Sequence, residues 1–111
     1  MTLITDLSTA AFEEEVLLAT QPVLLDFHAK WCGPCKAIMP TLEDLAREYE
    51  GEVRIVKIDI EEESDLAERF TVRSVPTFVL MKNGEEQERP AGILTRGSLS
   101  ALFERYLGEA Q

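Results

Sequence analysis

The chain has 111 residues, of which 45% are hydrophobic and 29% are charged, and its formal net charge at pH 7 is −10. This length suits one domain with one hydrophobic core, so we expect residues 1–111 to form a single domain. The acidity argues against binding to nucleic acid or to an anionic membrane surface, because both favour a basic face. No apolar run is long enough to span a bilayer. The start of the chain lacks the basic and apolar segments of a signal peptide, which favours the cytoplasm.

The first quarter of the chain predicts a strand, a helix and a second strand. Leu3-Ile4 indicates a short edge strand, and Ser8 or Thr9 can cap the helix that follows. The apolar residues of this helix recur at helical spacing: Phe12, Val16 and Ala19. The most apolar run of the chain, Val23-Leu24-Leu25-Asp26-Phe27, shows no polar alternation, so it predicts a strand covered on both faces.

The middle of the chain predicts two helices around a second central strand. The first helix runs from Pro34 to about Tyr49, and Pro40 inside it should produce a kink. Residues 53–58 predict the strand, and residues 64–70 predict a short helix.

The last third predicts a hairpin and a final helix. Residues 77–82 form a strand pattern, and Asn83-Gly84 is a strong hairpin signal because both residues tolerate positive φ. The polar return strand, residues 86–89, indicates a sheet edge. Thr95 can cap the last helix and Gly108 can end it. The element order β-α-β-α-β followed by α-β-β-α predicts an α/β fold, with a central mixed sheet of about five strands and four helices on both faces.

The only two cysteines stand two residues apart in Trp31-Cys32-Gly33-Pro34-Cys35-Lys36, where the buried strand gives way to the helix. We expect Cys32 at the helix N-terminus, where free N–H groups and the helix dipole favour a thiolate. Pro34 suits the first helical turn, and Gly33 removes side-chain bulk beside the sulfur. Cys35 lies about one turn on, so it should point toward the protein, be less exposed than Cys32, and close a ring with it. This geometry suits a dithiol that cycles between two thiols and a disulfide.

A zinc site is the alternative use of such a cysteine pair. Zinc takes four ligands, and the chain has no further cysteine and only one histidine, His28. We therefore expect no metal.

The hexapeptide around the cysteines resembles the active site of the thioredoxin family. Val23-Leu24-Leu25-Asp26-Phe27 before it, and Val75-Pro76-Thr77-Phe78 and Gly92 after it, agree with the same family, so the resemblance covers essentially the whole chain. It implies the thioredoxin fold and reduction of disulfide-containing protein substrates through Cys32 and Cys35. It further implies a cytoplasmic monomer. The chain has no Gly-X-Gly-X-X-Gly pattern, so we expect it to bind neither a nucleotide nor a flavin cofactor of its own. The electron donor would be a thioredoxin reductase, a flavin enzyme that uses NADPH.

The resemblance also assigns catalytic roles to two charged residues. Asp26 would lie buried behind the second cysteine and move a proton to and from Cys35. Burial should then raise its pKa above the usual value. Lys57 would face it from the neighbouring strand and partly offset the burial of its charge. The alternatives are a solvent-facing Asp26 at a strand end and a solvated Lys57.

The resemblance places a substrate-binding surface around a cis-proline. The bond before Pro76 would be cis and face the disulfide, which leaves the backbone of Val75 free to pair with an extended peptide. The implied surface is apolar and low in charge: Trp31, Gly33, Pro34, Val75, Pro76, Gly92 and Ile93.

His28 departs from the family, which most often has a second tryptophan at this position. The substitution either changes packing alone or places a titrating imidazole that, with Gly33 and Pro34, tunes the redox chemistry of the thiolate. Two other functions stay open. A thioredoxin-fold scaffold of a larger complex would need no intact dithiol, and the Gly-Pro pair between the cysteines argues against a dedicated oxidant.

Overall fold

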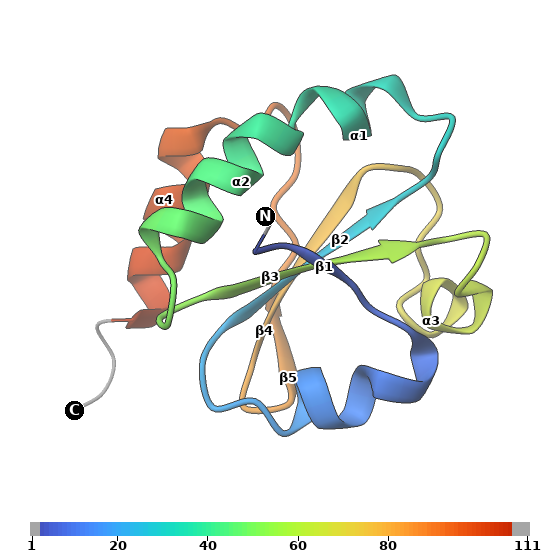
Figure 1. Ribbon diagram of the computed structural model, residues 1–111, viewed down its shortest axis with the longest axis horizontal. Coiled ribbons are helices and arrows are strands. Elements are labelled where there is room, and N and C mark those ends of the chain that lie inside the picture. Colours follow the sequence, from blue (N-terminus) through green and yellow to red (C-terminus); the bar gives the residue numbers. More distant parts are fainter. Residues whose placement is uncertain (1–2, 108–111) are drawn as a thin grey trace.

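A computed structural model describes residues 3–107 and shows one central sheet with helices on both sides (Figure 1). The strand order is β1-β3-β2-β4-β5. The three strands β1, β3 and β2 are parallel, while β4 runs antiparallel to β2 and β5 antiparallel to β4. The five strands are β1 (Thr5–Asp6), β2 (Val23–His28), β3 (Arg54–Asp59), β4 (Thr77–Lys82) and β5 (Glu85–Glu88). The predicted α/β fold with a mixed five-stranded sheet is confirmed.

Helices cover both faces of this sheet. On one face lie α1 (Gly33–Ala37), α2 (Met39–Glu48) and α4 (Arg96–Leu107), and on the other lie α3 (Ser64–Arg69) and two N-terminal turns (Figure 1). The turns are a 3₁₀ segment, Thr9–Ala11, and a π-helical segment, Glu13–Leu17. Because side chains alternate along a strand, each central strand contributes to two separate cores.

The two cores explain why β2 has no polar alternation. Leu24 packs with the α2 and α4 residues Leu42, Leu45 and Leu99 on one face. Leu25 and Phe27 pack on the other face with Phe12, Val16 and Leu66. Asp26, which lies on the same face as Leu24, is the exception to this apolar pattern.

Several local predictions are confirmed. The predicted kink appears as a break at Ile38 between α1 and α2, because Pro40 has no N–H to continue the helical ladder. Asn83 and Gly84 form the hairpin with positive φ of 56° and 78°. Thr95 caps α4, since its Oγ1 accepts the Ser98 N–H at 3.1 Å. Gly108, the expected end of α4, lies outside the described residues.

Two predictions near the N-terminus are wrong in detail. The strand is Thr5–Asp6 and not Leu3-Ile4, because Thr5 and Asp6 pair with Val56 and Lys57 while Ile4 is buried in the core. The first helix has the predicted buried face, but its turns are 3₁₀ and π rather than α. The spacing of apolar residues predicts which side of a helical segment is buried. It does not distinguish α from 3₁₀ or π hydrogen bonding, because the three helix types have similar numbers of residues per turn.

Candidate active site

The cysteine pair lies where β2 leads into α1. Cys32 is the N-cap of α1 in an extended conformation, and its Sγ accepts the backbone N–H of Cys35 at 3.2 Å. Pro34 occupies the first turn, as expected for a residue without an N–H. The two cysteines form a disulfide with a Cα–Cα distance of 5.3 Å. A Cβ added at Gly33 would meet no atom within 4 Å, so this position is open to an approaching molecule.

The expected difference in exposure between the two cysteines is wrong. Each is 3% exposed, because both pack against Ala29, Ile60 and Val75 in one small cluster. What distinguishes them is position. Cys32 caps the helix, whereas Cys35 lines a cavity of about 380 Å³ beside β2 and β3. Any difference in their roles therefore has to come from the helix N-terminus and from this cavity.

Asp26 is the most completely buried charged residue among residues 3–107. It is 0% exposed, and neither of its carboxylate oxygens has a hydrogen-bond partner. Burial raises the pKa of Asp26 to about 7, and the positive charge of Lys57 opposes this shift without cancelling it. A solvent-facing carboxylate is therefore excluded, and Asp26 titrates close to neutral pH.

Lys57 lies directly across from Asp26 in the parallel pairing of β2 and β3. Its Nζ lies 3.8 Å from Oδ1 of Asp6 on β1, and its side chain is 28% exposed. Lys57 also lines the same cavity as Cys35. Lys57 therefore interacts electrostatically with both the buried carboxylate of Asp26 and the exposed carboxylate of Asp6.

His28 ends β2, two residues after Asp26 and on the same face. It pairs in register with Asp59 and lines the cavity that Cys35 and Lys57 also line. Its Nε2 is buried and has no hydrogen-bond partner. Burial lowers the pKa of His28, Asp59 opposes this effect, and Lys57 adds to it. The imidazole of His28 therefore shares one cavity with Cys35 and Lys57.

A second cavity, of about 480 Å³, includes in its lining Pro34, which stands between the two cysteines in the sequence. Pro34, Pro76, Gly92 and Ile93 line it, as do Ala37, Ile38, Thr41, Phe78, Pro90, Ala91 and Leu94. No residue in this lining carries a charge, and Ile93 is 93% exposed. The peptide bond between Val75 and Pro76 is cis. The structure thus brings four of the expected binding residues into one apolar groove.

The remaining expected binding residues, Trp31, Gly33 and Val75, do not line the groove. Val75 packs on the cysteine cluster. Trp31 is 66% exposed, and its indole N–H donates to Oε2 of Glu61 at 3.2 Å.

Sequence reasoning missed Asp59 and Glu61. Asp59 directly follows the predicted strand 53–58, and the observed strand extends to it, so a strand prediction one residue longer would have placed Asp59 on the same face as Lys57. Glu61 gave no such signal, because the loop after β3 brings it to Trp31. Within residues 3–107, no three His, Cys, Asp or Glu side chains lie close enough together to hold a metal ion. Over the same range, no helix has both the length and the apolar character that crossing a membrane requires.

Comparison with known proteins finds one family over almost the whole chain. A family model described as thioredoxin matches residues 3–105. A thioredoxin of Pseudomonas aeruginosa is 40% identical over 101 residues, which cover 91% of this chain and 94% of that protein. A thioredoxin of Synechocystis is 37% identical over 100 residues, covering 90% of this chain and 94% of that protein. The M-type chloroplastic thioredoxin of spinach is 38% identical over 92% of this chain and 56% of its own length.

Proposed function

The chain belongs to the thioredoxin family and is a thiol–disulfide oxidoreductase that reduces protein disulfides, and we propose that Cys32 attacks first and Cys35 second. The observation that carries this order is the position of Cys32 at the N-terminus of α1, where its Sγ accepts the Cys35 N–H. A donor there stabilises a thiolate, and the thiolate is the attacking species. Cys35 instead lines the cavity shared with Lys57 and His28.

The reaction proceeds in two exchanges of sulfur partners. The Cys32 thiolate attacks one sulfur of the substrate disulfide, a Cys32–substrate disulfide forms, and the other substrate sulfur leaves with the electron pair and takes up a proton. Cys35 then loses its proton and attacks Sγ of Cys32. The Cys32–Cys35 bond forms, and the second substrate sulfur leaves as a thiolate that is protonated by solvent. The substrate has gained two electrons and two protons, and the dithiol has become a disulfide.

Asp26 accepts the proton of Cys35 in this scheme. A carboxylate with a pKa of about 7 is ionised in roughly half of the molecules at neutral pH, so it can take up a proton and release it again. Lys57, across from Asp26, keeps the buried charged form accessible. Gly33 and Pro34 fix the start of α1 beside Cys32, and His28 places an imidazole at the shared cavity, so these three residues tune the dithiol.

The apolar groove takes the substrate polypeptide. Its lining by Pro34, Pro76, Gly92 and Ile93 supports this role, because uncharged surface beside the disulfide accepts many different sequences. Trp31, Gly33 and Val75 complete the surface around the dithiol, and the Val75 backbone pairs with an extended substrate chain. Specificity then comes from access to the substrate disulfide rather than from its sequence.

Disulfide-containing proteins are the substrates, and a reductase returns the dithiol to its reduced form. We propose that this reductase is an NADPH-dependent flavin enzyme and that the protein works as a cytoplasmic monomer. The cysteine usage supports the compartment, because both cysteines belong to the redox pair and a reducing compartment keeps such a pair active.

Trapping experiments test the order of attack. Cys35→Ser should accumulate Cys32–substrate disulfides when the reduced variant is incubated with a cell extract, and Cys32→Ser should accumulate few. Non-reducing gels measure both, and mass spectrometry identifies the trapped proteins. Equal trapping by the two variants would contradict the assigned order.

Insulin reduction separates the oxidoreductase from a thioredoxin-fold scaffold. The wild-type protein should reduce insulin with dithiothreitol as the electron source, and Cys32→Ser should not. A wild-type protein that leaves insulin disulfides intact would favour the scaffold.

A further inference from the structure

Three buried polar atoms without partners mark one face of β2. Among residues 3–107, the only buried side-chain nitrogen or oxygen atoms without a hydrogen bond are Oδ1 and Oδ2 of Asp26 and Nε2 of His28. Folded proteins pair the large majority of such atoms, so an exception calls for a physical reason. The two residues that carry these atoms stand two positions apart on β2, so they share the face of Leu24, which packs against α2 and α4.

A single cavity joins His28 to Cys35. The cavity of about 380 Å³ is lined by His28, Cys35 and Lys57, together with Ala29, Lys30, Lys36 and Met39. Lys30 and Lys36 are exposed, so the cavity reaches the surface on their side. Most of the lining is apolar, but His28 and Lys57 bring nitrogen-bearing side chains to it, and a space of this size has room for water molecules that hydrogen-bond to them. His28 therefore lies between the buried face of β2 and solvent.

Charged groups of both signs face His28. Asp59 lies opposite His28 in the register of β3. Lys57 lies two residues before Asp59 on the same face of β3, and Asp26 lies two residues before His28 on the same face of β2. Asp6 from β1 and Glu62 from the loop after β3 add negative charge, while Lys30 and Lys36 line the cavity mouth. Burial favours the neutral ring and Asp59 favours the imidazolium, while Lys57 adds to the effect of burial, and the net result is a lowered pKa for His28.

We propose that His28 carries the proton between the buried carboxyl group of Asp26 and solvent in each catalytic cycle. This inference rests on the proposed role of Asp26 as the acceptor of the Cys35 proton. In this proposal His28 influences the dithiol by moving the proton of Asp26, and it does not act on the sulfur atoms themselves. An imidazole is useful here, because one ring nitrogen can accept a proton while the other releases one.

The proton balance of the relay follows from the two exchanges. When Cys35 attacks Cys32, its proton moves to the carboxylate of Asp26, which becomes neutral. Before the next cycle this proton moves through water to the imidazole of His28, because the carboxyl group and the ring share no direct hydrogen bond, and Asp26 becomes a carboxylate again. His28 then releases a proton to solvent. No electrons move in these steps.

Steady-state reduction of insulin, with dithiothreitol in excess as the electron source, tests the relay, because the proposed transfer from Asp26 to His28 takes place between cycles. The turnover rate is measured between about pH 5 and pH 9. We expect His28→Ala to be about tenfold slower than wild type near neutral pH, which is less than the loss of a group that transfers a proton directly to the reacting atom. Added imidazole should restore most of the rate. His28→Gln should be equally slow, and it carries the test if His28→Ala fails to fold.

A double variant separates the relay from direct tuning of the dithiol. If His28 acts through Asp26, then His28→Ala should slow the Asp26→Asn protein little further, and imidazole should not accelerate the double variant. An undiminished effect of His28→Ala in the Asp26→Asn background overturns the relay, because it shows action on the sulfurs. Full-rate reduction by His28→Trp or His28→Gln over the whole pH range also overturns it. A wild-type protein that cannot reduce insulin would instead refute the proposed function.

Discussion

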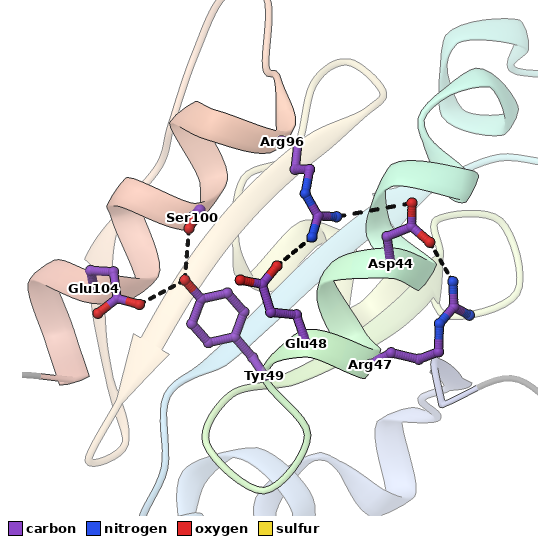
Figure 2. A network of polar contacts seen from close by, with 7 residues as sticks. All are labelled: Asp44, Arg47, Glu48, Tyr49, Arg96, Ser100 and Glu104. Atoms are coloured by element: carbon purple, nitrogen blue, oxygen red, sulfur yellow. Dashed lines mark hydrogen bonds and ion pairs between the residues drawn. The ribbon is translucent and has the colours of Figure 1, made fainter.

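Two groups of polar side chains lie on the same side of the sheet and are arranged in opposite ways. The first is the α2–α4 polar network of Asp44, Arg47, Glu48, Tyr49, Arg96, Ser100 and Glu104 (Figure 2). Its centre is the Tyr49 hydroxyl, which donates to Oε2 of Glu104 and shares a hydrogen bond with Oγ of Ser100, both at 2.7 Å. Arg96 at the start of α4 reaches Glu48 and Asp44 on α2. Each residue of this network therefore has a partner.

The second group is Asp26 and His28 on β2. Asp26 lies deeper than any residue of the network, and the buried atoms of both residues lack hydrogen bonds. Leaving buried polar groups unpaired costs stability, whereas pairing them at a helix contact holds the helices in place. Among residues 3–107 the molecule accepts this cost only on this face of β2, where the proposed proton transfer uses a carboxyl group with a raised pKa.

The largest expected effect is a gain in stability on removal of Asp26. Because the folded pKa of about 7 exceeds the unfolded value of about 3.9, the native state holds the proton more tightly. Stability therefore falls as the pH rises between these values, and above about pH 7 the ionised group costs about 4 kcal/mol. Asp26→Ala should then be more stable than wild type at pH 8, by about 2–3 kcal/mol once the small cavity is counted.

Urea unfolding at several pH values measures this gain. It should shrink or reverse below about pH 4, where Asp26 is protonated in both states. Asp44→Ala, which removes an exposed carboxylate from the α2–α4 network, is the matched control and should give no such gain. Asp26→Ala should also reduce insulin more slowly, because Cys35 loses its proton acceptor. If the variant is less stable than wild type at pH 8, the burial argument for Asp26 fails.

The contrast between the two groups also shows which features the sequence could predict. Asp26 inside an apolar run, the cysteine spacing and the Asn83-Gly84 hairpin are local patterns with direct physical meaning, so each was predictable. The fold followed from the order of such patterns. The groove residues Pro34, Pro76, Gly92 and Ile93 could be grouped only through the family resemblance, because no local pattern relates them.

Features that depend on three-dimensional packing were not predictable. The equal burial of Cys32 and Cys35 depends on Ile60 and Val75, which come from distant segments. The place of β1 was predicted two residues too early, because the apolar residues Leu3 and Ile4 pack on the core, whereas the residues in register with β3 are Thr5 and Asp6. The α2–α4 polar network was not predicted at all, since its partners lie about fifty residues apart.

A smaller effect is expected from the centre of the network. Tyr49→Phe keeps the ring, whose centroid lies 5.1 Å from that of Phe103, and removes only the hydroxyl. We expect a loss of about 1–2 kcal/mol in unfolding free energy, because one of the two lost hydrogen bonds has a charged acceptor while Glu104 can regain water. Ser100→Ala removes one of these bonds and should cost less. A loss near zero for Tyr49→Phe would show that the hydroxyl network does not hold α4 against α2.

The smallest effect is expected from Arg96, at the exposed edge of the same network. Its side chain is 50% exposed, and Glu48 and Asp44 are similarly open to solvent, so the ion pairs should contribute no more than about 1 kcal/mol. Arg96 also stands at the start of α4, where a positive charge opposes the helix dipole, so Arg96→Ala relieves one unfavourable interaction while losing two pairs. The net loss in unfolding free energy should be about 0.5 kcal/mol or less, and it should disappear at high salt. Arg47→Ala is the matched control, because Arg47 pairs with Asp44 within α2 alone and bridges no helices. A salt-independent loss of about 2 kcal/mol for Arg96→Ala, absent from Arg47→Ala, would show that the exposed edge holds the helices together as strongly as Tyr49 does.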